Sequence, residues 1–208
     1  MNEIYHELHF NNRVVKTFKK RDANFWKAFK KNKNKYPQKI AVTDGDKKFS
    51  YEEIYNFVLN QSSYIKNLGI KKGDRICLLF ENSWPLIVYT LVGLKNGVII
   101  VPLNPKSSEV ENQMIIDDCT PKAVFLDQNF CKNLPSKDNI STVADIIVFQ
   151  ENTILKNKTI PAIDEIKVNE ENTAFILYTS GTTGKPKGAM LTNFNIIHSC
   201  LHFKRHFN

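Results

Sequence analysis

Residues 175–188 read FILYTSGTTGKPKG, and this stretch lies where three patterns meet. An apolar strand pattern from Ala174 to Tyr178 comes first, a loop over 179–191 follows, and a helical pattern runs from Asn193 to Phe207. The loop holds three of the chain's eight glycines, four hydroxyl side chains and two lysines. A strand, a glycine-rich loop and a helix in this order predict an α/β sheet with a ligand at the carboxyl end of the strand.

The side chains of this loop suit a polyphosphate. Glycines let backbone N–H groups turn toward an anion, hydroxyls donate hydrogen bonds to phosphate oxygens, and lysines neutralise charge. An ordinary surface loop seldom combines these residue types directly after a strand. The candidate phosphate-binding residues are Thr179, Ser180, Gly181, Thr182, Thr183, Gly184, Lys185, Lys187 and Gly188.

Two common nucleotide-binding motifs are excluded. A Walker A loop requires Gly five residues before Gly184 and Ser or Thr directly after Lys185, but those positions hold Thr179 and Pro186. The spacing G-x-G-x-x-G does not occur in the loop either, so a dinucleotide-binding fold has no support. The loop therefore predicts phosphate binding by a different class of α/β protein.

Outward from the loop, strand patterns alternate with helix patterns. The runs Arg75 to Phe80 and Val98 to Val101 are strongly apolar, as expected for strands buried on both faces of a sheet. Alternating strands and helices predict right-handed βαβ units, and hence an α/β fold with a mostly parallel sheet flanked by helices. The other expected elements are an irregular arm over 1–21, a hairpin over 39–51, further strands over 123–126 and 146–149, and a polar surface excursion over 150–172.

Three helix starts are indicated by capping residues. Ser50 with Glu53, and Ser108 with Glu111, have the spacing of capping boxes, in which each side chain satisfies a backbone N–H of the other residue. Asp22 is the expected cap of a first helix that carries three aromatic residues and stops near residue 37. A nearly apolar helix from Trp84 to Lys95 is expected to end at Asn96-Gly97.

The string LYTSGTTGKPKG (177–188) resembles the phosphate-loop signature of the adenylate-forming, or AMP-binding, superfamily. Three upstream segments look like family segments in the same order: FSYEEI (49–54), GDRICLLFENS (73–83) and LKNGVIIVPLNP (94–105). The resemblance covers about residues 22–207. It implies the N-terminal subdomain of the adenylate-forming fold in truncated form, with residues 1–21 as an arm and 22–208 as an incomplete AMP-binding domain.

The resemblance implies a two-step reaction. A carboxylate attacks the α-phosphate of ATP to give an acyl-adenylate and pyrophosphate, and a thiol, usually coenzyme A, then displaces AMP. Mg²⁺ is expected to arrive with ATP, and its protein ligand is expected downstream of residue 208. Lys187 is the residue expected to contact the phosphate charge during catalysis, because Lys185 stands at a variable position of the signature.

Two branches of the superfamily fit, and a third alternative is non-catalytic. VPLNP (101–105) and GAMLTNFNI (188–196) look like acyl-CoA synthetases of medium- or long-chain fatty acids, which we favour over a peptide-synthetase adenylation domain. The third alternative is a nucleotide-binding remnant without turnover. Family members are two to three times longer than 208 residues, so the isolated chain is expected to form no acyl-adenylate.

The formal charge of +8 does not indicate a nucleic-acid partner. The basic residues are 25 Lys and only 4 Arg, and Arg is the residue that reads guanine edges and clamps phosphate with two hydrogen bonds. The expected partners are a small carboxylic acid, ATP and coenzyme A, without nucleic acid. The sequence contains no transmembrane pattern, leaves peripheral association with a membrane open, and does not indicate an oligomeric state.

Cysteine usage and the N-terminus favour a cytoplasmic protein. The four cysteines are widely spread without a C-x-x-C pair, which favours reduced thiols over disulfides, and the N-terminus lacks the apolar core of a secretory signal.

His198, His202 and His206 recur at i, i+4 and i+8 on one helix face, a spacing at which two histidines can bind Zn²⁺. We favour ordinary packing of this helix, with its partners expected beyond residue 208, and therefore predict no metal ligand.

Overall fold

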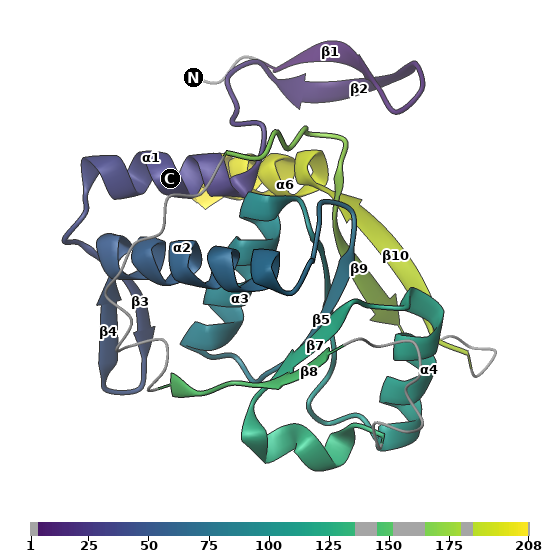
Figure 1. Ribbon diagram of the computed structural model, residues 1–208. Coiled ribbons are helices and arrows are strands. Elements are labelled where there is room, and N and C mark those ends of the chain that lie inside the picture. The colour runs from purple at the N-terminus through teal and green to yellow at the C-terminus, as the bar shows by residue number, and fades with distance from the viewer. Residues whose placement is uncertain (1–3, 136–144, 152–164, 180–184, 208) are drawn as a thin grey trace.

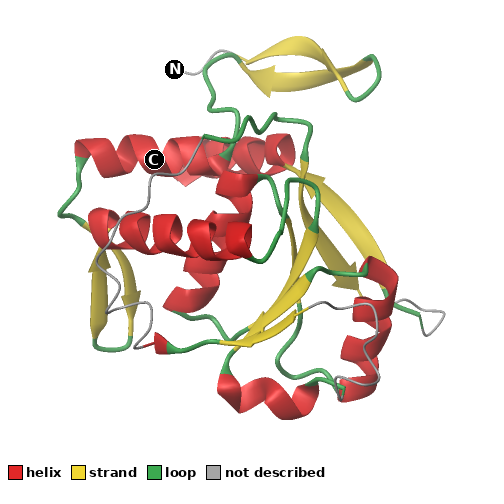
Figure 2. Cartoon of the chain, in the orientation of Figure 1, coloured by secondary structure: helices red, strands yellow, loops and turns green. Residues whose placement is uncertain are grey.

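The computed structural model describes residues 4–135, 145–151, 165–179 and 185–207. The described part contains a six-stranded sheet in the order β10-β9-β6-β5-β7-β8, flanked by helices (Figures 1 and 2). Five of these strands run parallel and β10 is antiparallel. The strands are β1 Ile4–His9, β2 Arg13–Phe18, β3 Ile40–Asp44, β4 Lys47–Ser50, β5 Arg75–Leu79, β6 Ile99–Pro102, β7 Ala123–Leu126, β8 Asp145–Val148, β9 Thr173–Thr179 and β10 Lys187–Thr192. The helices are α1 Phe25–Lys35, α2 Tyr51–Asn67, α3 Trp84–Asn96, α4 Glu109–Cys119, the 3₁₀ helix η1 Gln128–Asn133, and α6 Asn193–Phe207.

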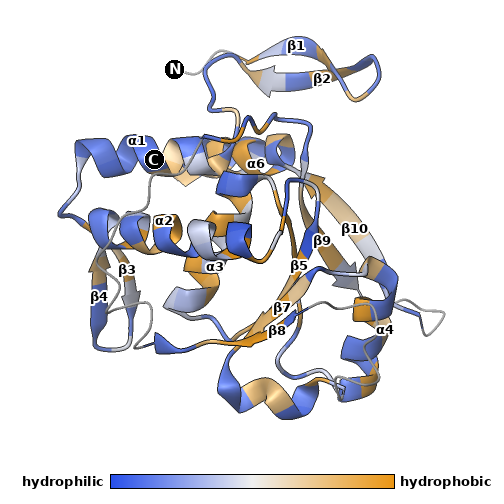
Figure 3. Ribbon diagram, viewed as in Figure 1, coloured by the Kyte–Doolittle hydropathy of each residue, from blue (hydrophilic) through white to orange (hydrophobic). Residues whose placement is uncertain are grey.

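The expected α/β fold with a mostly parallel sheet is confirmed. Strand β5 contributes to a hydrophobic core on each face of the sheet, because its side chains alternate. Ile76 and Leu78 belong to the core shared with α2 and α3, whereas Cys77 and Leu79 belong to the core shared with α4. Apolar colouring accordingly gathers on the central strands in Figure 3. The apolar run 75–80 was therefore correctly interpreted as a strand buried on both faces.

Both predicted capping boxes are present. The Ser50 side chain accepts a hydrogen bond from the backbone N–H of Glu53, whose carboxylate accepts one in return from Ser50, and Ser108 and Glu111 form the same pair at α4. The expected cap of α1 was wrong: the side chain of Asn24, and not that of Asp22, accepts the bond from the backbone N–H of Lys27. The helix therefore begins two residues later than its aspartate suggested.

The expected irregular arm over 1–21 is wrong, because its described residues form a hairpin. Strands β1 and β2 pair antiparallel in a separate two-stranded sheet, which lies at the end of the molecule near α6 (Figure 1). Three successive residues, Phe10, Asn11 and Asn12, turn the chain with positive φ angles. Asparagine tolerates this conformation well, so the Asn-Asn pair was the turn signal in the sequence.

The predicted hairpin over 39–51 is confirmed as β3 and β4, with Gly45 at positive φ in its turn.

All four cysteines are free, and the sulfur atoms of the two buried ones, Cys77 and Cys119, lie 3.8 Å apart. No helix in the described residues is both long enough and apolar enough to cross a membrane. The predicted polar excursion over 150–172 falls largely outside the described residues.

Candidate phosphate-binding site

The candidate site lies at the carboxyl edge of the parallel sheet. Strands β5, β6, β7, β8 and β9 run in the same direction, so their carboxyl ends share one edge. Chain order and sheet order differ here: β6 and β7 flank β5 on opposite sides, and β9 returns beside β6. Ligands of open α/β sheets bind at this edge, where the strand order reverses. Strand β9 ends at Thr179, the first candidate phosphate-binding residue.

The loop predicted over 179–191 is too long, and this expectation is corrected. Strand β10, Lys187–Thr192, pairs antiparallel with β9, so β9 and β10 form a two-stranded ribbon at the edge of the sheet. The sequence KGAMLT has weak strand character, and its partner β9 supplies the pairing. Of the predicted site residues, the structure places Thr179, Lys185, Lys187 and Gly188. The other candidates lie outside the described residues: Ser180, Gly181, Thr182, Thr183 and Gly184.

The structure brings Thr179 and Lys187 together across the ribbon. The two residues are directly opposed in the β9–β10 register, and opposed residues of an antiparallel pair project from the same face. Both are exposed, as is Lys185. Within the described part of the chain, neither Lys185 nor Lys187 forms an ion pair or a side-chain hydrogen bond. A hydroxyl and a primary ammonium group are thus presented side by side at the carboxyl edge of the sheet.

Gly188 lies in strand β10 and not in a turn. Its φ angle is not positive, so the turn does not require glycine at this position. A Cβ at residue 188 would lie 2.7 Å from Cγ2 of Ile176 and 3.0 Å from Cζ of Tyr178. The contact with Ile176 is shorter than real Cβ atoms show, and the contact with Tyr178 would require the ring to shift. Glycine is therefore favoured because the Ile176 and Tyr178 side chains on the neighbouring strand fill the space that a side chain would occupy.

Tyr178 connects the ribbon to α4, a contact that sequence reasoning missed. Its hydroxyl donates a hydrogen bond to a carboxylate oxygen of Asp118 near the end of α4. Burial of the ring, and then the bond to Asp118, raise the pKa of Tyr178 above its ordinary value, so the hydroxyl keeps the proton that it donates. The two residues are 60 positions apart, and no local pattern could have paired them.

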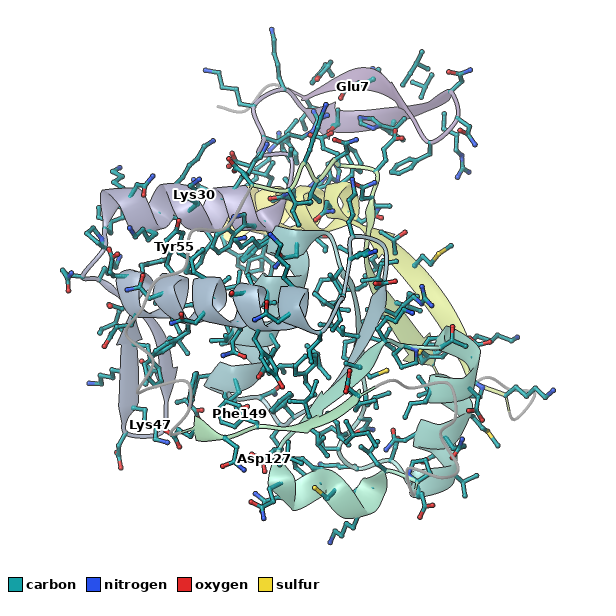
Figure 4. The ribbon with its side chains drawn as sticks, viewed as in Figure 1. Glu7, Lys30, Lys47, Tyr55, Asp127 and Phe149 are labelled. Atoms are coloured by element: carbon teal, nitrogen blue, oxygen red, sulfur yellow. The ribbon has the colours of Figure 1, made fainter. Side chains whose placement is uncertain are left out.

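Two further polar side chains near this edge stabilise their own segments. The Asn104 carboxamide oxygen accepts a hydrogen bond from the backbone N–H of Lys106, and the Asp127 carboxylate accepts one from the backbone N–H of Asn129 at the start of η1. Figure 4 places Asp127 at the start of that helix. Because these oxygens accept local backbone hydrogen bonds, Asn104 acts as a turn residue and Asp127 as a helix cap. The candidate phosphate-binding residues that the structure describes are therefore those of the β9–β10 ribbon.

The histidine face of α6 packs against the N-terminal hairpin. The ring of Phe18 on β2 lies 5.2 Å from the ring of His198 and 4.9 Å from that of His202. Burial, and then the neighbouring His202, lower the pKa of His198. Among the described residues, no group of three or more His, Cys, Asp or Glu side chains is arranged to hold a metal ion. This face therefore has a packing partner.

Comparisons with known proteins agree with this arrangement. The sequence profile described as "AMP-binding enzyme" matches residues 29–208. Gramicidin S synthase 2 from Brevibacillus brevis is 31% identical over 182 residues, which are 88% of this chain and 4% of the synthase. A 2-succinylbenzoate–CoA ligase from Bacillus licheniformis is 31% identical over 160 residues, which are 76% of this chain and 32% of the ligase.

A solved structure has the same fold. The Mycobacterium tuberculosis fatty acyl CoA synthetase superposes with a TM-score of 0.74 at 24% identity, over 82% of this chain and 35% of that protein. The chain thus spans about a third or less of each of these three proteins. The match of the AMP-binding profile to most of the chain carries the assignment, and the chain belongs to the AMP-binding enzyme family, the adenylate-forming superfamily.

Proposed function

We propose that the protein containing this chain activates a carboxylic acid with ATP and transfers the acyl group to coenzyme A. A carboxylate oxygen attacks the α-phosphorus, the bond from that phosphorus to the bridging oxygen of the β-phosphate breaks, and pyrophosphate leaves. The thiol sulfur of coenzyme A then attacks the acyl carbonyl, AMP leaves, and the thiol proton passes to solvent. Mg²⁺ bound with ATP would neutralise part of the phosphate charge.

One observation carries this proposal: Thr179 and Lys187 stand opposed and exposed at the carboxyl edge of the sheet, outside any ion pair among the described residues. An exposed cation on a rigid strand can stabilise the negative charge that develops on the departing pyrophosphate. Lys187 is the proposed catalytic residue on this basis. Lys185, Gly188 and the loop residues 180–184 complete the proposed phosphate-binding set.

A fatty acid is the substrate that we propose, and an amino acid is the second candidate. VPLNP and GAMLTNFNI favour fatty acyl-CoA synthetases. The 31% identity to gramicidin S synthase 2 supports a peptide-synthetase-type adenylation domain instead. The acid-binding residues and the C-terminal domain are expected beyond residue 208, so residues 22–208 are proposed as the first part of an AMP-binding domain. The proposed location is the cytoplasm, on the cysteine usage.

Acid-dependent exchange between ATP and labelled pyrophosphate tests the proposal. The protein translated from the complete reading frame is assayed with fatty acids of several lengths and with the twenty amino acids. Exchange with fatty acids, followed by acyl-CoA formation, is the expected result; exchange with an amino acid alone would move the assignment to the peptide-synthetase branch. The 208-residue chain serves as the control, and we expect no exchange from it. If the complete protein exchanges with no acid, a non-catalytic nucleotide-binding protein is favoured.

A further inference from the structure

The two faces of the β9–β10 ribbon have different surroundings. Thr179 and Lys187 share one face, where both are exposed. Their neighbours Tyr178 and Gly188 are also opposed, and they project from the other face, where Tyr178 packs against the core shared with α4. The residues that face a ligand therefore alternate with residues that attach the ribbon to the rest of the molecule.

Tyr178 makes two contacts on its own face of the ribbon. Its hydroxyl donates a hydrogen bond to the Asp118 carboxylate. Its ring lies close to Gly188: a Cβ added to Gly188 would be only 3.0 Å from Cζ of Tyr178. One side chain thus joins β9 to α4 and also contacts the backbone of β10. Helix α4 is itself well anchored, because Ile116 is fully buried and the Ser108–Glu111 capping box holds its first turn. The contact with Asp118 therefore connects the ribbon to a fixed element.

We infer that Tyr178 and Asp118 are positioning residues that hold Thr179 and Lys187 in register for binding the β- and γ-phosphates of ATP. The inference rests on the proposed function, since it assigns the ligand of the ribbon to a pyrophosphate group. Neither side chain touches the ligand in this account. Their contribution is pre-organisation: a ribbon that is already fixed loses less conformational freedom when the anion binds.

Three variants separate the hydrogen bond from the charge of Asp118. Tyr178→Phe removes the donor and keeps the ring against Gly188. Asp118→Ala removes both the acceptor and the negative charge, whereas Asp118→Asn removes the charge and keeps an amide oxygen that can accept. Because the two Asp118 variants lose the same charge, the difference between their affinities reports the hydrogen bond to Tyr178.

The matched control is Tyr89→Phe. The Tyr89 hydroxyl, on α3, donates to the side-chain oxygen of Gln61 at 3.1 Å in the buried core, away from the ribbon. Removing it eliminates the same chemical group and is expected to lower the unfolding midpoint without changing the affinity for an anion. Each variant is therefore compared in two measurements: thermal unfolding, and calorimetric titration of the 208-residue chain with inorganic pyrophosphate.

We expect Tyr178→Phe and Asp118→Ala to weaken pyrophosphate binding by about tenfold and Asp118→Asn by about threefold, with Tyr89→Phe unchanged, on the scale of one hydrogen bond. Equal affinities for the unchanged chain and Tyr178→Phe would overturn the positioning role and leave the proposed function standing. Equal affinities of Asp118→Asn and Asp118→Ala would also overturn it. If the unchanged chain does not bind pyrophosphate, this inference is overturned, whereas the exchange assay of the complete protein tests the proposed function separately.

Discussion

Two antiparallel ribbons of this molecule use their cations in opposite ways. The chain that leaves β2 of the N-terminal hairpin carries Arg21, whose side chain is only 8% exposed and whose guanidinium group is surrounded by acceptors. In the β9–β10 ribbon, Lys187 is exposed and has no ion-pair partner among the described residues. The first cation is occupied in holding the fold together, whereas the second is available to a ligand.

Arg21 connects the N-terminal hairpin with Glu170, which is 149 residues away in sequence. It forms ion pairs with Glu7 at 2.6 Å and Glu170 at 2.8 Å, and it donates to the backbone oxygen of Phe18 at 2.8 Å. Glu7 lies on the hairpin in Figure 4. Its pKa is lowered: burial opposes the shift, but hydrogen bonds from His9 and Arg21 outweigh it. The hairpin is thus held by charge pairs that reach the segment before β9.

Arg21 and Lys187 carry the same charge but differ in their partners, so the partners of a residue, and not its charge, indicate what it does. We therefore expect removal of the Arg21 cation to lower the stability of the fold, and removal of the Lys187 cation to lower only the affinity for a ligand.

The largest effect on stability is expected at Arg21. Arg21→Ala leaves the Glu7 and Glu170 carboxylates without their shared partner, and we expect the free energy of unfolding to fall by about 3 kcal/mol. Urea unfolding measures it. Arg13→Ala is the matched control, since Arg13 is exposed on the same hairpin. Its effect should stay within about 0.5 kcal/mol. Similar losses for both variants would mean that the ion pairs do not hold the hairpin.

A smaller loss is expected for Gly188→Ala. The added methyl group must displace Ile176 or Tyr178, which costs about 2 kcal/mol as overpacking, and it should also weaken pyrophosphate binding because β10 moves. Gly45→Ala is the control: its φ of +58° causes backbone strain of about 1 kcal/mol, but no atom lies within 4 Å of the added Cβ. An unchanged pyrophosphate affinity in Gly188→Ala would show that the spacing of the ribbon is not required.

The smallest effect on stability is expected from a change of pH at the histidine face of α6, which packs against the hairpin. His198, beside Phe18, His202 and Arg21 and near the backbone oxygen of Lys16, has a pKa below its ordinary value of 6.5. The unfolded chain therefore binds more protons below pH 6.5, so the stability present above that pH is lost as pH falls through the folded pKa. His198→Gln should flatten urea-measured stability between pH 7 and pH 5, and His6→Gln should not. Equal slopes in both variants would exclude His198 as the cause.

Much of the parallel sheet could be predicted from the sequence because its signals are local. The continuous apolar run at 76–80 and the capping boxes at Ser50 and Ser108 each specify their own segment. Strands β1, β2 and β10 were missed because their stability comes from partners elsewhere: Arg21 reaches Glu170, and β10 depends on β9. Such partners cannot be identified from a local sequence pattern.

The candidate site divides in the same way. Its residue types and their position after a strand could be recognised, because phosphate binding demands glycines, hydroxyls and lysines close together. The need for glycine at position 188 and the contact between Tyr178 and Asp118 could not be predicted from the sequence, because each depends on how two elements pack.

The role of Lys187 in phosphate binding is tested by calorimetric titration of inorganic pyrophosphate into the unchanged chain and into Lys187→Ala, with Lys185→Ala as the matched control. Both lysines are exposed, so neither variant should change the unfolding midpoint by more than a small amount. We predict at least about a tenfold loss of affinity for Lys187→Ala, the scale of about 1.4 kcal/mol for a charge-assisted contact, and a smaller loss for Lys185→Ala. An unchanged affinity in Lys187→Ala would exclude Lys187 as a phosphate-binding residue.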